Sequence, residues 1–200
     1  QTKTGESIVL KVMHDGVHES LETDLLTLRG IMLSSRAFGR SGEEITDLFD
    51  EVAEHLRAEL DYLQEAANIH AFSEIFADDD RFLLPSIHPQ WCTERVLAMD
   101  RLEGVSLRTF IDRGTAEARQ RAGMSLAEWF FESTFHHRIL HADPHPGNFL
   151  FCEDGRVGVV DFGCVKRFDE FFLGRYGQVV LDALDGKNDA VLDGCIALGV

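Results

Sequence analysis

The hydrophobic residues of this chain recur at helical spacing over long stretches and at strand spacing over several short ones. Between residues 43 and 76 the apolar positions lie three or four apart, which predicts one long amphipathic helix. These positions are Ile45, Leu48, Phe49, Val52, Leu56, Leu60 and Leu63. The same spacing predicts helices over 17–38 and 115–138 and a helical tail from about residue 169. Residues 125–128 (Ser-Leu-Ala-Glu) fit a capping box, which favours a later start for the second of these helices.

Short runs rich in β-branched and aromatic residues predict strands between the helices. The run 8–13 is one of them, and Lys11 is its one charged residue. The other expected strands are residues 83–91 with 95–99, as a pair, and residues 149–151 with 157–160, as a hairpin around Glu-Asp-Gly. Helices and strands mixed along one chain of 200 residues indicate an α+β fold.

Two short motifs in the last third of the chain carry the most specific chemistry. Four residues separate Asp143 from Asn148, and Asp161 ends an apolar strand directly before Phe-Gly. Kinase-like enzymes use this order of residues to hold magnesium and nucleotide phosphates against an acceptor hydroxyl. One carboxylate lies near the acceptor, while an amide oxygen and a second carboxylate are the hard ligands that Mg²⁺ prefers. The two motifs together predict a magnesium-dependent phosphoryl-transfer site.

Two acids on the long predicted helix raise the question of a cationic partner. Asp61 and Glu65 are four residues apart and therefore share a helix face, where like charges repel by about 0.2–0.5 kcal/mol. Either both carboxylates are solvated or a cation is brought to them. Lys11 is the candidate cation, and the plainer alternative is an edge-strand lysine that points into solvent.

The charge balance narrows the range of partners. The chain has 19 Lys plus Arg against 35 Asp plus Glu, a net charge of −16, and no basic stripe, so nucleic acid is not an expected partner. Residues 43–80 hold 13 acids and one base, Arg57, which is typical of a solvated helix face. The four cysteines lack Cys-x-x-Cys spacing and are expected to be reduced thiols. No apolar run approaches the roughly 18–20 residues that span a bilayer.

Further motifs give the chain a resemblance to a known family. The run 141–148 (His-Ala-Asp-Pro-His-Pro-Gly-Asn) departs from the His-Arg-Asp of ordinary protein kinases, and the run 59–66 is Glu-Leu-Asp-Tyr-Leu-Gln-Glu-Ala. Residues 9–12, and residues 96–100 followed by Gly104, complete the pattern. In these features the chain resembles the UbiB-like family of atypical kinases, also called aarF-domain kinases, over nearly its whole length.

The resemblance implies a protein-kinase-like fold of two lobes. Residues 1–99 would form a partial small lobe with the strand lysine and the equivalent of the kinase C helix. Residues 100–104 would be the hinge, and residues 105–200 a partial, mostly helical large lobe with the catalytic loop and Asp-Phe-Gly. The chain starts at Gln1, and we expect it to be part of a longer protein.

The resemblance also assigns roles to the matching positions. Lys11 would contact the nucleotide phosphates and pair with Glu65, and Asp143 would be the catalytic-loop aspartate. Asn148 and Asp161 would be the magnesium ligands. The hinge residues that would hold adenine through backbone hydrogen bonds are Asp100, Arg101, Leu102 and Glu103. The acidic motif that faces a segment peculiar to these kinases would be Glu59 and Asp61.

The implied activity is that of an ATPase or kinase that uses ATP and Mg²⁺ and supports isoprenoid (ubiquinone-type) quinone biosynthesis. The implied location is cytoplasmic, peripheral to a membrane, with lipid, quinone precursors and quinone-biosynthesis proteins as partners. The family's alanine-rich nucleotide loop and Lys-x-Gly-Gln segment precede the lysine strand and are absent from residues 1–200, so we expect these residues alone to be weakly active or inactive. The segment after Gly163 is short, which argues against an activation loop and a peptide substrate.

Several alternatives use the same residues. A small-molecule phosphotransferase of the aminoglycoside or choline kinase type shares the Asp–Asn loop, and a nucleotide-sensing pseudokinase scaffold would need no turnover. The ligand types of a zinc or iron site are also present, in His137, His141, Asp143 and His145. Prolines flank His145, however, and such a site leaves the Asp-Phe-Gly motif unexplained.

The remaining side chains of interest receive plainer interpretations. His141 is expected to brace the catalytic loop, and Cys164 to behave as a small apolar residue. An aromatic run on the helix over 115–138 is expected to pack in the core rather than contact lipid or quinone. Its members are Trp129, Phe130, Phe131 and Phe135.

Overall fold

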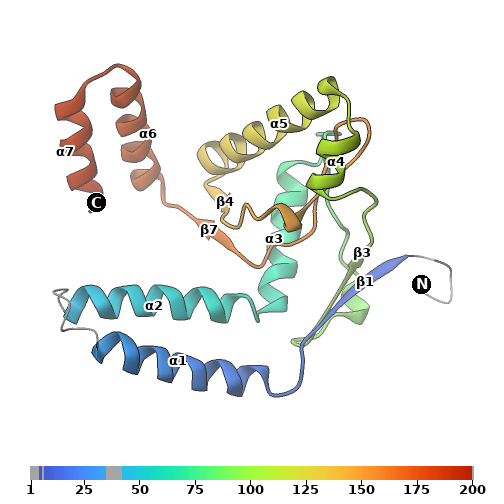
Figure 1. Ribbon diagram of the computed structural model, residues 1–200, viewed down its shortest axis with the longest axis horizontal. Coiled ribbons are helices and arrows are strands. Elements are labelled where there is room, and N and C mark those ends of the chain that lie inside the picture. The colour runs from blue at the N-terminus through green and yellow to red at the C-terminus, as the bar shows by residue number, and fades with distance from the viewer. Residues whose placement is uncertain (1–4, 6, 35–41, 200) are drawn as a thin grey trace.

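The computed structural model describes residues 5, 7–34 and 42–199. Figure 1 shows two helices lying side by side at one end of the molecule, α1 (Val17–Ser34) and α2 (Gly42–Ala58). They bury a small apolar cluster of their own, centred on Leu25, Phe49 and Ala53. The predicted helix over 17–38 is therefore present as far as Ser34, and its last residues lie outside the described part of the chain.

The long helix predicted over 43–76 is two helices, so that prediction is wrong in its middle. After α2, the amides of Leu60 and Asp61 bond carbonyls three residues back, which tightens and ends the helix. The Asp61 carboxylate then accepts a hydrogen bond from the backbone N–H of Gln64 at 2.9 Å and caps α3 (Tyr62–Ile75). Asp61 is thus the N-cap of α3, whereas Glu65 is a buried residue of its first turn.

Three small sheets position the site. The first pairs β1 (Ile8–Val12) antiparallel with β3 (Val96–Asp100), in a register that sets Lys11 opposite Leu97. The second has the order β2-β6-β5, and the third pairs β4 with β7. Their strands are β2 (Phe82–Leu83), β5 (Phe149–Phe151), β6 (Val157–Val159), β4 (Ile139–His141) and β7 (Val165–Arg167).

The strand predictions are confirmed in one place and wrong in another. The hairpin of β5 and β6 is present, with Phe149 opposite Val159. The expected pairing of 83–91 with 95–99 is reduced to a bridge between Ile87 and Met99 on the edge of β3 opposite to β1. The segment between them instead contains a 3₁₀ turn, Pro89–Trp91.

The main core is aromatic and lies where α3 meets α5 (Ala116–Phe131). Phe72 stacks on Trp129 with ring centroids 4.9 Å apart, and Phe162 packs on Phe72 at 5.2 Å. Thr115 caps α5, so the later start suggested by the capping box is wrong and Ser125 is buried in mid-helix. The short helix α4 (Leu107–Arg113) precedes α5.

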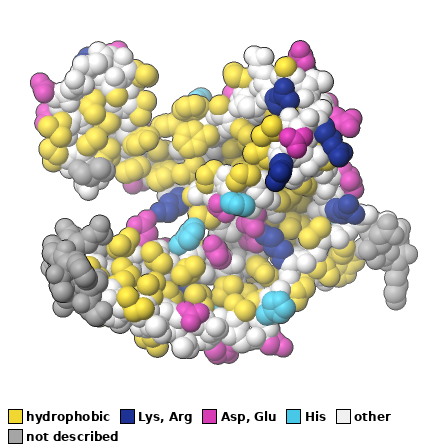
Figure 2. Space-filling model, viewed as in Figure 1, with side chains coloured by type: hydrophobic (Ala, Val, Ile, Leu, Met, Phe, Trp, Pro, Cys, Tyr) yellow, Lys and Arg dark blue, Asp and Glu magenta, His cyan; other side chains and the backbone are white. Residues whose placement is uncertain are grey.

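The core prediction for the aromatic run is right for Trp129 and wrong for its neighbours. Trp129 is buried, whereas Phe130 and Phe131 are largely exposed. The reason is the helix period: only one side of α5 faces α3, and a π-helix, Glu132–His136, follows α5 directly. Figure 2 shows hydrophobic side chains gathered on the surface around the hollow of the molecule.

The tail forms a hairpin of two helices, α6 (Glu170–Leu184) and α7 (Asn188–Leu198), that projects from the rest of the chain in Figure 1. Gly186, at a φ of +73°, makes the turn between them, and Gly194 of α7 packs closely against Val179. Only two residues separate β7 from α6, in agreement with the short segment expected after Gly163. Among the described residues, no helix combines the length and apolar composition needed to cross a membrane.

Candidate functional site

A cavity of about 460 Å³ opens between β1, β3 and the loop that precedes β5. Most of the residues that the sequence singles out for nucleotide and metal binding line it. They are Lys11, Asp100, Arg101, Leu102, Glu103, Asn148 and Asp161. The apolar side chains of Val9, Met99, Leu150 and Val160 cover the walls between them. The cavity therefore joins a charged end to an apolar end.

Lys11 lies at the charged end between two carboxylates. Its Nζ forms an ion pair with Glu65 and lies 2.8 Å from Oδ2 of Asp161. The Lys11 side chain is 25% exposed and that of Glu65 only 3%, so the pair is shielded from water. The structure thus brings together the lysine and the glutamate that the sequence pairs, and excludes the solvated edge-strand alternative for Lys11.

The protonation of this cluster follows from its contacts. Burial by itself would lower the pKa of Lys11, but the charge of Glu65 and hydrogen bonds to both carboxylates raise that pKa above its ordinary value. Burial would likewise raise the pKa of Asp161, yet the hydrogen bonds from Lys11 and from the Gly163 N–H lower it. Lys11 and Asp161 are both charged at neutral pH.

Helix α3 holds the backbone of Phe162 by both of its polar groups. Oε1 of Glu65 accepts a hydrogen bond from the Phe162 N–H at 3.2 Å, and Nδ2 of Asn68 donates to the Phe162 carbonyl at 3.0 Å. Gln64 donates to the Asn68 amide oxygen at 3.0 Å and fixes its orientation. Sequence analysis missed Asn68, and its position three residues after Glu65, on the same helix face, is the signal that marks it.

The loop before β5 is shaped by its own side chains. Asn148 Nδ2 donates to Oδ2 of Asp143 at 2.7 Å, while Oδ1 of Asp143 accepts from the backbone N–H of His145 at 3.1 Å. His145 in turn accepts from the Gly147 N–H. Because its amide nitrogen faces Asp143, Asn148 keeps its side-chain oxygen free of protein donors among the described residues.

The donor set fits magnesium better than a transition metal. A carboxylate of Asp161 and the amide oxygen of Asn148 are hard oxygen ligands. Within the described residues, no group of three or more His, Cys, Asp and Glu is arranged to hold a metal ion. His137 lies near Glu132, and His141 bonds a backbone carbonyl, so the imidazoles of the predicted zinc or iron alternative do not converge.

Some backbone N–H groups of the predicted hinge are bonded within the protein, and others are free to donate to a ligand. The N–H groups of Asp100 and Arg101 bond Ser86 and Ser7, so neither is free for a ligand. Those of Leu102 and Glu103 make no hydrogen bond within the described part of the chain. The Asp100 side chain is held by His88, whose Nε2 lies 2.8 Å from Oδ1 of Asp100. Burial would raise the pKa of Asp100, but the bonds from His88 and Ser86 lower it.

Four of the expected site residues lie off the cavity wall. Glu65 forms an ion pair with Lys11, and Asp143 accepts a hydrogen bond from Asn148. Glu59 is exposed next to the Asp-Phe-Gly turn, with its Cα 4.0 Å from the point where a Gly163 side chain would start. Asp61, the other member of the acidic motif, caps α3. Neither Glu59 nor Asp61 contacts Lys11.

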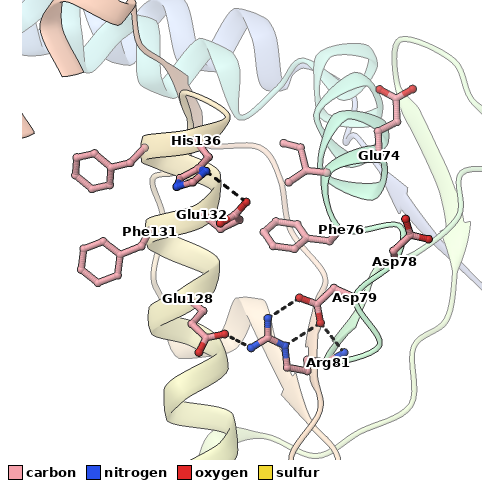
Figure 3. A pocket seen from close by; sticks show the side chains of 11 residues that line it. Glu74, Phe76, Asp78, Asp79, Arg81, Glu128, Phe131, Glu132 and His136 are labelled. Carbon is pink, nitrogen blue, oxygen red and sulfur yellow. Dashed lines mark hydrogen bonds and ion pairs between the residues drawn. The ribbon is translucent and has the colours of Figure 1, made fainter. Parts of the chain in front are cut away.

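A larger cavity, of about 630 Å³, lies elsewhere, between α3 and the end of α5 (Figure 3). Arg81 crosses its floor and bonds Asp79 and Glu128 (Figure 3). None of the residues predicted for nucleotide or metal binding lines it. Size therefore does not identify the site in this protein, and the chemistry of the lining does.

Comparison with known proteins decides the family. The model of the ABC1 atypical kinase-like domain matches residues 1–193. The chain belongs to this ABC1 family. The resemblance to UbiB-like, aarF-domain kinases is thereby confirmed, since the curated relatives include aarF domain-containing kinases.

Two curated relatives of this ABC1 chain illustrate the match. The mitochondrial atypical kinase COQ8B of Rattus norvegicus is 29% identical over 95% of this chain and 36% of its own length. The chloroplastic protein ACTIVITY OF BC1 COMPLEX KINASE 1 of Arabidopsis thaliana is 30% identical over 90% of this chain and 26% of its own. The chain thus spans between a quarter and two fifths of these relatives.

A solved structure supports the fold. The complex of Rv3197 with erythromycin, from Mycobacterium tuberculosis, is 31% identical, with a TM-score of 0.73 over 96% of this chain and 48% of that one. The kinase-like α+β fold expected from the sequence is therefore confirmed. The division at residues 100–104 stays a prediction.

Proposed function

We propose that this site binds Mg²⁺ and ATP and transfers the terminal phosphoryl group to an acceptor hydroxyl or to water. The observation that carries the proposal is the position of Lys11. Its ammonium group is held at the charged end of the cavity by Glu65 and Asp161. The free N–H of Leu102 belongs to the same cavity wall, in the segment after β3. A phosphate chain and a base can be held by these two kinds of donor.

Each side chain has a role that its contacts support. Lys11 would steady the phosphates, and the oxygens of Asn148 and Asp161 would hold the magnesium ion. When bound, the ion would neutralise part of the negative charge of the phosphates. Asp143, whose carboxylate is already fixed by Asn148, would orient the attacking hydroxyl or water and take up its hydrogen bond. The catalytic contribution is mainly positioning and electrostatic stabilisation.

The Leu102 and Glu103 segment would hold adenine. The free N–H groups there can donate to ring nitrogens, and the apolar side chains of Val9, Leu150 and Val160 can cover the two faces of a planar base. The backbone N–H groups of Asp100 and Arg101 would not donate to adenine, because they already bond carbonyl groups of the protein. These two residues would instead shape the backbone of the hinge.

The test is magnesium-dependent ATP binding and turnover by the full-length protein, with Asp161→Ala as the diagnostic variant. We expect turnover to fall at least about a hundredfold, because a magnesium ligand and a Lys11 partner are both lost. Asp193→Ala, on α7, is a matched control that removes an aspartate away from the cavity. Turnover of Asp161→Ala equal to that of the control would refute the proposal.

The same assay separates the alternatives. ATP binding without turnover, in the presence of lipid or without it, would favour the non-catalytic scaffold. Transfer to an added amino alcohol would favour the aminoglycoside or choline kinase type of reaction.

For the biological role, we propose support of isoprenoid quinone biosynthesis at a membrane surface, with lipid or quinone precursors and quinone-biosynthesis proteins as partners. Its support is the UbiB-like pattern of residues 59–66 and 141–148. A host that lacks the protein should recover its ubiquinone-type quinone when complemented with the wild type and not with Asp161→Ala. Equal recovery with both would contradict a role for ATP turnover there.

A further inference from the structure

A smaller cavity, of about 380 Å³, lies between one face of α5 and the turn that joins β5 to β6. Arg121 and Ser125, one helical turn apart on α5, contribute to it from one side. Arg156 contributes from the turn. None of the residues of the nucleotide cavity takes part, so the two cavities are separate.

Both arginines are anchored in a way that leaves their ends free. Nε of Arg121 donates to the Asp154 carbonyl at 3.0 Å, and Nε of Arg156 donates to the Asp154 carboxylate at 2.9 Å. Their terminal nitrogens make no hydrogen bond within the described residues. A guanidinium fixed through Nε presents two terminal N–H₂ groups, which can bind the oxygens of a phosphate or carboxylate.

The turn is pressed against α5 at Gly155. Gly155 has a φ of +87°, and a Cβ there would lie 3.0 Å from the Ala118 carbonyl and 3.1 Å from Cβ of Arg121. Only glycine tolerates both the left-handed backbone and this approach. This backbone contact therefore places the turn that carries Arg156 beside the part of α5 that carries Arg121.

Ser125 supplies the second, independent observation. Only 4% of the residue is exposed, yet its side chain lines the cavity. Within the described part of the chain its hydroxyl makes no hydrogen bond, and because the hydroxyl oxygen is not sealed in the core, a ligand in the cavity can reach it. An oxygen of a bound anion would give this hydroxyl an acceptor.

Three arginines gather at this cavity, on a chain that is acidic as a whole. The whole chain carries −16, whereas this cavity is lined by Arg81, Arg121 and Arg156 against Glu117 and Asp154. Arg81 is already committed to Asp79 and Glu128, as Figure 3 shows. The anion site therefore consists of the two arginines with free ends and the Ser125 hydroxyl.

We propose that this cavity binds the phosphate group of a small phosphate monoester. Arg121 and Arg156 hold the phosphate oxygens, and Ser125 donates its hydroxyl to one of them. The apolar side chain of Met124, which also lines the cavity, contacts the organic part of the ester. This inference does not depend on the proposed ATP site, since it shares no residue with it.

Calorimetric titration of the full-length protein tests the proposal, with inorganic phosphate and phenyl phosphate as probes. A Lys11→Met background removes the phosphate contact of the nucleotide cavity, and binding to the second cavity should persist in it. We expect R121Q/R156Q to weaken both probes at least about tenfold. R108Q, which removes an exposed guanidinium outside the cavity, is the matched control and should bind as the parent does.

Ser125→Ala separates binding from folding. Alanine is the better helix former, so thermal stability should be kept or raised, while affinity for both probes falls about threefold. Met124→Ala should remove the preference for phenyl phosphate over inorganic phosphate. No measurable binding, binding lost in Lys11→Met, or binding unchanged in S125A and R121Q/R156Q would each overturn the proposal. Inorganic phosphate bound as tightly as phenyl phosphate would overturn the assignment of an ester.

Discussion

His141 Nε2 lies 2.7 Å from the carbonyl oxygen of Asp161, so the strand that leads into the catalytic loop is tied to the Asp-Phe-Gly turn. The imidazole donates this bond, since a carbonyl can only accept. The ring is buried beside Phe72 and Phe162, and its Nδ1 makes no hydrogen bond among the described residues. The expectation that His141 braces the loop is confirmed, with Asp161 as the group it braces.

Replacement of His141 by alanine should lower both stability and turnover. The change removes a buried hydrogen bond and leaves a cavity, for a loss of about 2–4 kcal/mol in the free energy of unfolding. Denaturant unfolding measures this loss, and ATP turnover at saturating nucleotide measures the effect on Asp161. His70→Ala, an exposed histidine on α3, should change neither quantity. Equal stability of the two variants would contradict the bracing role.

Replacement of Lys11 by methionine should make stability less dependent on alkaline pH. The pKa of Lys11 is raised by folding, so its stabilising contribution is complete below the ordinary value of 10.5 and is lost as pH rises through the higher folded pKa. Below pH 10 the wild type should exceed Lys11→Met by about 2–3 kcal/mol, because the variant leaves Glu65 buried and unpaired. Chemical unfolding across pH 7–11 gives the two curves. A constant difference across this range would show that the ion pair is not its source.

Replacement of Glu65 by glutamine should reduce turnover more than it reduces stability. The amide oxygen of glutamine can still accept from the Phe162 N–H, but the charge that holds the Lys11 ammonium is gone. Lys11 then has Asp161 as its one carboxylate partner, and we expect turnover to fall about tenfold to a hundredfold. Steady-state kinetics and thermal unfolding of the same preparation give the comparison. Full turnover would mean that Glu65 has no role in placing Lys11.

Replacement of Asn68 by leucine should destabilise the protein and weaken the site. The similar-sized side chain fills the space but leaves the buried carbonyl of Phe162 without its donor, at a cost of about 1–3 kcal/mol. Ser73→Ala, in the last turns of α3, serves as the control for a polar group of the same helix that does not bond Phe162. Unfolding curves and the magnesium dependence of ATP binding test this, and an unaltered magnesium dependence would limit Asn68 to a structural role.

The sequence indicated the cavity chemistry well because local motifs encode it. Asp143 and Asn148 belong to one loop, and Asp161 follows the hairpin of β5 and β6 that begins at the end of that loop. The short spacing alone therefore predicts that the three side chains lie close together. The meeting of Lys11 with Glu65 needed more, since 54 residues separate them. The spacing of Asp61 and Glu65 made Lys11 a candidate partner with a solvated lysine as the alternative, and the family resemblance then assigned the pair to Lys11 and Glu65.

The failures have physical causes that periodicity does not report. Apolar spacing continues through Leu60, yet the N-cap formed by Asp61 divides the helix there, because a local side-chain bond overrides the pattern. The choice of β1 as the partner of β3 depends on long-range contacts, as does the burial of Trp129 beside the exposed Phe131. Asn68 was missed because an asparagine on a helix carries no motif until its distant partner is known.

Helix α3 carries Glu65 and Asn68 on one face and is also capped by Asp61, so one rigid element contacts Lys11 and the Asp-Phe-Gly turn together. A partner or ligand that tilts α3 would break its contacts with Lys11 and with the Asp-Phe-Gly turn at the same time. One that holds α3 in its present orientation would restore both contacts. With two residues between β7 and α6, the chain offers little room for a phosphorylated loop to perform this function. Control of such a site would act through the orientation of α3, which would change the contacts of Glu65 and Asn68 together.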